Sequence, residues 1–244
     1  MEFRLLGAVE ADAAGRRVEL GPRLNRLILG VLALEVNRPV GLDRLVELGW
    51  PASPPRTAAQ AVMVGVSQLR KALTVAGVPP DDAELLRKGS GYVLRTDPHQ
   101  VDAYRFRALV DRARAAGDDA GRIALLDEAL RLWTGPVLDD AASPGVRERL
   151  CRGLDEARLA ASEDRLDALL RCGRHRSALG ELPGLVDIHP QRERLVFQLM
   201  LALYRDGRAG EALAVYRAAR DRLATDLGLD PGPDMRAQER EILR

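Results

Sequence analysis

The residue types that most often carry out catalysis are sparse in this chain and are not grouped. Its two cysteines, Cys151 and Cys172, lie in helical patterns and form no CxxC or Cys/His ligand spacing, which favours ordinary helix packing. The histidines stand far apart, at His99, His175 and His189. The only lysines, Lys71 and Lys88, do not follow a glycine-rich phosphate loop, which excludes a P-loop nucleotidase at the level of motifs. We therefore predict no enzyme activity, no metal and no cofactor, because the sequence offers no convergent nucleophile, acid/base pair or metal cluster.

Residues 56–73 carry side chains suited to binding and not to catalysis, because they can form hydrogen bonds and ion pairs. Apolar residues at helical spacing predict a helix, and its inward stripe is Val62, Val66, Leu69 and Leu73. The candidate contacts on the rest of this helix are Arg56, Gln60, Met63, Val64, Ser67, Gln68, Arg70 and Lys71. When a helix lies in the major groove of DNA, such polar side chains can bond base edges and the basic ones can neutralise phosphates. A merely solvated helix face has the same pattern, so both interpretations stay open at this point.

The segments before this helix predict a hairpin and two further helices. Residues 3–9 and 17–20 read as two strands around a turn that contains Gly15. Pro22 suits the first position of a helix, and the apolar positions that follow it have helical spacing. A second, short helix is expected over Leu42–Gly49, with Leu45 and Leu48 facing inward.

A second hairpin is predicted after the third helix, with strands over residues 85–88 and 92–95 around Gly89-Ser90-Gly91. Arg87 and Lys88 make this hairpin basic and are candidate DNA contacts, whereas Tyr92 is expected in the core. Hairpin, three helices and hairpin is the element order of a winged helix-turn-helix.

The rest of the chain predicts an all-α domain after a linker at Asp97-Pro98. Gly173 and Gly207 lie 34 residues apart, and each is followed at the same spacings by small or apolar residues. This period is typical of tetratricopeptide repeats, in which paired helices stack. The predicted fold is therefore mainly α: a winged helix-turn-helix (α+β) over residues 1–96 and a tetratricopeptide-like helical repeat domain over residues 97–244.

Length and charge agree with two domains of different character. A chain of 244 residues leaves room for two cores. No apolar run reaches the roughly 18 residues of a membrane span, and the N-terminus has no signal-peptide pattern, so we expect a cytoplasmic location. The net charge is +1, but residues 1–96 hold 13 basic and 10 acidic side chains, whereas residues 97–244 hold 24 and 26. This small excess supports DNA binding only weakly.

Several stretches together resemble one family. They are Phe3-Arg4-Leu5-Leu6-Gly7, Asp43-Arg44-Leu45-Val46, Val66-Ser67-Gln68-Leu69-Arg70-Lys71-Ala72-Leu73, Gly91-Tyr92, Leu201-Ala202-Leu203-Tyr204-Arg205-Asp206-Gly207-Arg208, Glu211-Ala212-Leu213-Ala214-Val215-Tyr216 and Leu227-Gly228-Leu229-Asp230-Pro231-Gly232-Pro233. On these residues the whole chain resembles the SARP (Streptomyces antibiotic regulatory protein) transcriptional activators.

The resemblance implies an OmpR/PhoB-like winged helix followed by a bacterial transcriptional activator domain. It implies that the third helix reads DNA and that the hairpin carrying Arg87 and Lys88 is the wing. The expected partners are promoter DNA with direct repeats, in secondary-metabolite (antibiotic) clusters, RNA polymerase, and a second copy of the chain on DNA.

The chain departs from the family pattern at Gly49, Met63, Gly65 and Gln68. Met63 offers no hydrogen bond to a base but lies beside the outward face of the helix, where it can touch a thymine methyl group. Gly65 weakens a helix by about 1 kcal/mol relative to alanine, but it lies near the core flank, where a glycine allows close packing. If the helix is merely weakened, Gly65→Ala is expected to raise stability. These departures favour a second hypothesis, a protein-interaction scaffold whose winged helix has weakened or lost DNA binding.

Overall fold

The computed structural model describes all 244 residues and divides them into two compact units. The first unit consists of Met1–Asp111 and Glu128–Arg158, and the second of Arg112–Asp127 and Leu159–Arg244. No helix is both long enough and apolar enough to cross a membrane.

The first unit begins with a three-stranded antiparallel sheet in the order β1-β2-β3. Its strands are β1 (Glu2–Arg4), β2 (Glu10–Ala13) and β3 (Arg16–Arg17). The predicted turn at Gly15 is confirmed, since Ala14 and Gly15 have φ of 50° and 76°. The predicted strand over residues 3–9 is wrong beyond Arg4, because Phe3 pairs with Ala11 and the chain from Leu5 to Val9 turns its backbone groups to partners elsewhere in the unit.

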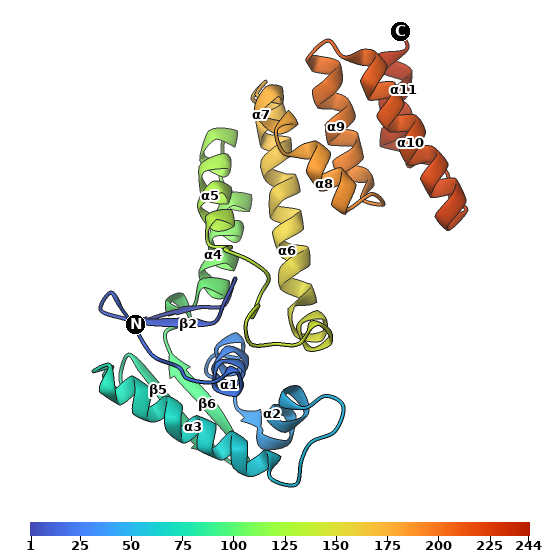
Figure 1. The fold of residues 1–244 in the computed structure, drawn as a ribbon. Helices are drawn as coiled ribbons and strands as arrows, with labels where there is room; N and C mark the ends of the chain where they lie inside the picture. Colours follow the sequence, from blue (N-terminus) through green and yellow to red (C-terminus); the bar gives the residue numbers. More distant parts are fainter. The chain divides into compact units, whose positions relative to one another are not determined.

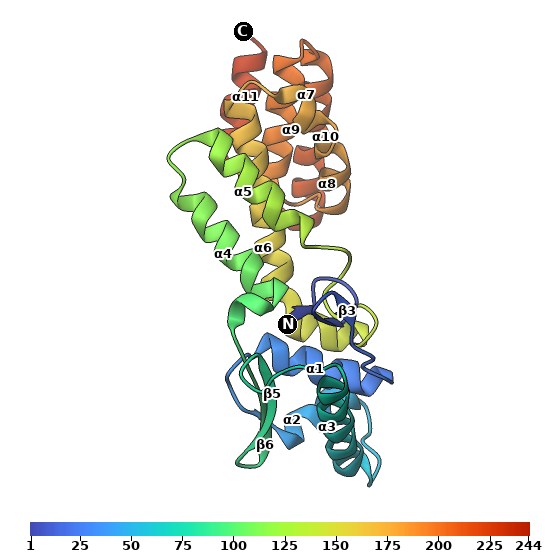
Figure 2. The ribbon, with the colours of Figure 1, turned by 90° about the vertical axis from the view of Figure 1, so that its left-hand side faces the viewer.

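Three helices and a second sheet follow. They are α1 (Arg23–Leu34), β4 (Val40–Gly41), α2 (Leu42–Gly49), α3 (Ala58–Val75), β5 (Ala83–Lys88) and β6 (Gly91–Thr96). The predictions for α2 and the β5–β6 hairpin are confirmed. The two-residue strand β4 was not predicted; it pairs with β6, and the sheet order is β4-β6-β5. Figures 1 and 2 show α3 beside the β5–β6 hairpin.

Buried leucines and valines hold these helices together. Leu27, Ile28 and Leu32 of α1 face Leu45 of α2 and the predicted stripe of α3 in one core, and all are at most 5% exposed. Tyr92 is also buried, at 7% exposure, as predicted. The first sheet, the three helices and the β5–β6 hairpin therefore form the predicted winged helix-turn-helix. The strand predicted over residues 17–20 is wrong beyond Arg17, and β3 pairs with β2 and not with β1.

The first unit continues past residue 96, where the sequence placed the end of its first domain. The Asp102 carboxylate, 4% exposed, accepts hydrogen bonds from the backbone N–H groups of Leu5 and Leu6 at 2.9–3.0 Å. The backbone N–H groups of Thr134 and Leu138 donate to the carbonyls of Leu6 and Leu5. Residues 102 and 134–138 thus complete the backbone hydrogen bonding of the segment after β1, which residues 1–96 alone cannot do.

The remaining elements are helical. They are the short 3₁₀ helix η1 (Pro98–Gln100), α4 (Asp102–Ala115), α5 (Asp119–Arg131), α6 (Pro144–Arg171), α7 (His175–Leu179), α8 (Leu182–Ile188), α9 (Glu193–Arg205), α10 (Ala209–Leu227) and α11 (Pro233–Ile242). In the second unit α9 lies beside both α10 and α11 (Figure 1).

The two glycines of the 34-residue repeat each lie just after the end of a helix in the second unit. Gly173 and Gly207 follow α6 and α9 with φ of 73° and 80°, a left-handed conformation that favours glycine. Five residues after each glycine, Ala178 and Ala212 are fully buried in the helical core. The predicted tetratricopeptide-like stacking is therefore present at these two positions.

Candidate nucleic-acid interface

Helix α3 is fixed by one face and exposes the other. Its buried stripe of Val62, Val66, Leu69 and Leu73 is at most 5% exposed. All ten predicted contact residues are exposed: Arg56, Gln60, Met63, Val64, Ser67, Gln68, Arg70, Lys71, Arg87 and Lys88. The first eight lie on α3 or just before it, and the last two lie at the end of β5. The fold thus brings together two sets of residues that are about 16 positions apart in the chain.

Gly65 lies on the buried side of α3 where α1 approaches closely. A Cβ atom added there would lie 2.8 Å from Asn25 Oδ1 and 2.9 Å from Ile28 Cδ1, which is closer than real contacts allow. The glycine therefore permits close helix packing, as its place near the core flank predicted, and this geometry contradicts the alternative that Gly65→Ala raises stability.

Asn25 of α1 contacts both the buried side of α3, near Gly65, and Gln68 on its exposed face. Its side-chain amide, 3% exposed, donates to the Leu20 carbonyl at 3.1 Å and to Gln68 Oε1 at 2.9 Å. Gln68 is thus oriented by a partner inside the domain and differs in this respect from Ser67, its exposed neighbour.

Arg70 braces α3 against the hairpin. Its Nε donates to the Leu85 carbonyl at 2.7 Å, and its guanidinium lies 6.0 Å from the centre of the Tyr92 ring. This structural role was not predicted from the sequence, since helical spacing shows only that Arg70 faces outward. Lys71, the next residue, forms no ion pair and is free to contact a ligand.

The hairpin presents two cations at its tip. Lys88 pairs with Gly91 across the turn, and Gly89 has a φ of 59°. Gly91 admits no side chain, because a Cβ atom there would lie 2.1 Å from the Val40 carbonyl oxygen of β4. Arg87 and Lys88 form no ion pair, in contrast to Arg95 on β6, which pairs with Glu84 at 2.5 Å.

Four cations of this surface, Arg56, Lys71, Arg87 and Lys88, have no acidic partner within the protein. Between them on α3, the apolar side chains of Met63 and Val64 are 42% and 48% exposed. A convex helix with uncompensated cations, hydroxyl and amide groups and an apolar patch can contact phosphates, base edges and thymine methyl groups.

The two cysteines lie in different surroundings. Cys151 is buried, and burial raises the pKa of its thiol to about 12, so the nucleophilic thiolate is not populated at neutral pH. Cys172 is exposed and free. No three or more His, Cys, Asp or Glu side chains are grouped so that they could hold a metal ion.

Comparison with known proteins gives matches over the whole chain. The family model described as bacterial transcriptional activator domain matches residues 101–243. The transcriptional regulator RedD of Streptomyces coelicolor is 37% identical over 250 residues, which cover all of this chain and 70% of RedD. The regulatory protein AfsR of the same organism is 38% identical over 248 residues, which are 24% of its length.

A solved structure has the same fold. Mycobacterium tuberculosis EmbR, in complex with a low-affinity phosphopeptide, superposes with a TM-score of 0.89 and 37% sequence identity. The match covers all of this chain and 65% of the EmbR chain. RedD and EmbR are named as transcriptional regulators, and AfsR is named as a regulatory protein. The chain therefore belongs to the SARP family of transcriptional regulators, as its sequence motifs predicted.

Proposed function

We propose that this chain is a sequence-specific DNA-binding transcriptional activator that places α3 in the major groove and the β5–β6 hairpin on the adjacent phosphate backbone. The observation that carries this proposal is the exposed surface of α3 and the hairpin tip, where four cations lack any acidic partner. Within this surface Ser67 and Gln60 are the polar side chains that can bond base edges, and Met63 and Val64 can contact thymine methyl groups.

The promoters are proposed to carry direct repeats, each bound by one copy. Two copies dock on the same face of the duplex when the repeats lie about one helical turn apart, roughly 10 to 10.5 base pairs. Secondary-metabolite (antibiotic) clusters are the proposed targets, because the chain belongs to the SARP family and resembles the Streptomyces regulators RedD and AfsR. The stacked helices of the second unit offer surfaces for RNA polymerase or for a second copy, as such stacks commonly do. A DNA-binding protein of this kind works in the cytoplasm.

The test is binding of the full chain to duplexes from the promoters upstream of its own gene and neighbouring genes, measured by fluorescence anisotropy. The proposal expects preferential binding to duplexes with direct repeats, and weaker binding by Ser67→Ala and Lys71→Ala. Arg16→Ala is the matched control, because Arg16 is an exposed arginine on β3 with no ion pair. If folded protein binds no promoter better than unrelated DNA, the scaffold hypothesis is the better one.

A further inference from the structure

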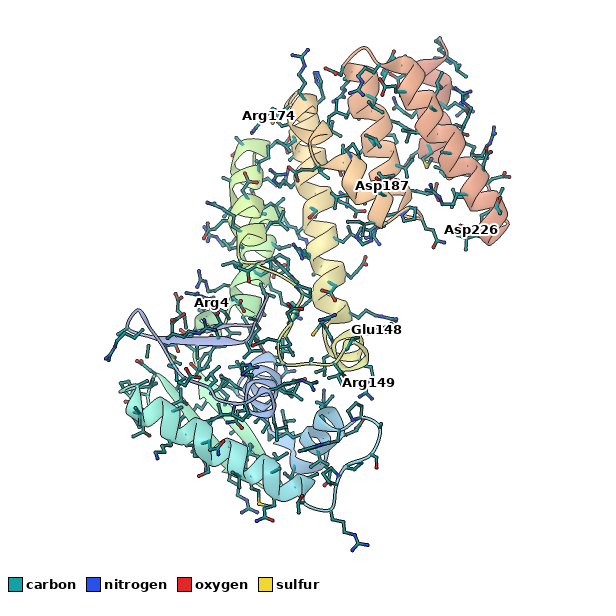
Figure 3. The ribbon with its side chains drawn as sticks, viewed as in Figure 1. Arg4, Glu148, Arg149, Arg174, Asp187 and Asp226 are labelled. Carbon is teal, nitrogen blue, oxygen red and sulfur yellow. The ribbon has the colours of Figure 1, made fainter.

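A second group of arginines lies in the first compact unit and shares no residue with the surface proposed to contact DNA. Arg38, Arg44, Arg107 and Arg149 line a cavity of about 320 Å³ together with a single carboxylate, that of Glu35. They come from four places in the chain: the segment after α1, helix α2, helix α4 and the start of helix α6. Figure 3 labels Arg149 on the first turns of α6.

The positive charge of this cavity is only partly compensated. Arg149 pairs with Glu47 at 2.9 Å, and Arg44 lies 3.8 Å from Glu35, at the limit of an ion pair. Arg38 and Arg107 take part in no ion pair. Four cations around one small space repel one another, and a multiply charged anion would relieve that repulsion.

The cavity also has an apolar wall. Val31 and Leu34 of α1 and Leu150 and Leu154 of α6 line it. Beside them, the Tyr104 ring is held in place because its hydroxyl donates to the Leu34 carbonyl at 3.0 Å. The Arg107 guanidinium lies 6.0 Å from the centre of that ring. One side of the cavity therefore suits a planar apolar group, and its arginines suit a charged one.

We propose that this cavity binds a small organic phosphate with an aromatic body, of the nucleotide class. The guanidinium forks of arginine match phosphate oxygens, and four of them suit a polyanion better than a single carboxylate. The volume lies at the lower end of the range of small-molecule sites, roughly 300 to 1,000 Å³. A ligand here contacts α1 and α2 of the winged helix together with α4 and α6, so its binding links the DNA-binding elements to the helices that follow them.

The experiment measures binding of ATP, AMP and inorganic pyrophosphate to the full chain by calorimetry, without magnesium. We expect a nucleotide to bind with a Kd below about 1 mM and more tightly than pyrophosphate, because pyrophosphate lacks the aromatic body. Arg107→Ala and Arg38→Ala should each weaken nucleotide binding by about tenfold or more, as expected for loss of a hydrogen bond to a charged group.

Two further variants separate the cavity from general charge. Leu150→Trp fills the space without changing the charge and should abolish binding, whereas Arg16→Ala, which removes an arginine outside the cavity, should leave it unchanged. The proposal is overturned if no probe binds at about 1 mM, or if Arg16→Ala weakens binding as much as Arg107→Ala. It is also overturned if the cavity variants lose promoter binding while the wild type binds no probe, because the arginines then contact DNA phosphates.

Discussion

Replacing Asp102 by alanine removes the partner of two buried backbone groups and should destabilise the first compact unit strongly. One carboxylate oxygen accepts from Leu5 N–H at 2.9 Å, and the other accepts from Leu5 at 2.9 Å and Leu6 at 3.0 Å. A buried donor left without a partner costs about 1 to 3 kcal/mol, so the two together cost about 2 to 6 kcal/mol. Since domains of this size are stable by about 5 to 15 kcal/mol, the loss is a large share of the total.

Asp102→Asn should be milder than Asp102→Ala, because a single amide oxygen at the doubly bonded position can still accept from both Leu5 and Leu6. Both tryptophans, Trp50 and Trp133, belong to the first unit, so tryptophan fluorescence during urea unfolding of the full chain reports on that unit. The matched control is Asp81→Ala, which removes an exposed aspartate that forms no ion pair. If Asp102→Ala unfolds at the same urea concentration as Asp81→Ala, Asp102 does not hold the segment after β1 and the reasoning is refuted.

Three further predictions concern stability. Gly65→Ala gains about 1 kcal/mol of helix propensity but should lose about 1 to 3 kcal/mol to overpacking against Asn25 and Ile28. The control is Gly153→Ala in α6, which should be stabilising because an added Cβ there meets nothing within 4 Å. A higher urea midpoint for Gly65→Ala would contradict the close approach of α1 to α3. Leu69→Ala should cost roughly 2 to 5 kcal/mol, since Leu69 is 1% exposed, and circular dichroism melts that match the wild type would place it outside the core. Burial raises the pKa of Asp102 above its unfolded value of 3.8, so the contribution of this group to stability is fully present below about pH 3.8 and is lost as pH rises through the folded pKa. The urea midpoint of the wild type should therefore fall relative to that of Asp102→Asn as pH rises through the folded pKa. Midpoints of the two proteins that change in parallel with pH would refute this prediction.

Local patterns were sufficient to predict the helices of the winged domain. The stripe of Val62, Val66, Leu69 and Leu73 has helical spacing, and its burial follows from that spacing alone. Helix α2 was predicted with its observed ends because Pro39 lies just before it and Pro51 just after it. The exposure of the ten candidate contact residues was predictable for the same reason, since they occupy positions outside the apolar stripe or at a hairpin end.

Features that depend on contacts distant in sequence were not predictable. The strand over residues 3–9 ends early because Leu5 and Leu6 bond to Asp102, almost 100 residues away, and no local pattern encodes that partner. Strand β4 has only two residues, too few for alternation to show. Arg70 was predicted as a contact residue, but its bond to the Leu85 carbonyl depends on how the hairpin packs on α3. Close packing at Gly65 was predicted from its place beside the apolar stripe, but its partners Asn25 and Ile28 were not, because they belong to another helix.

The salt dependence of promoter binding tests the central claim most directly. If Arg56, Lys71, Arg87 and Lys88 each neutralise one phosphate, the logarithm of affinity should fall against the logarithm of salt concentration with a slope of about −3.6 per bound copy. That slope lowers affinity by roughly a hundredfold between about 50 and 200 mM salt. The double variant Arg87→Ala/Lys88→Ala should reduce the magnitude of the slope by about 2, while Arg16→Ala should leave it unchanged. Promoter affinity that stays flat over this salt range, or a slope that the hairpin double variant does not alter, would contradict DNA binding by α3 and the hairpin.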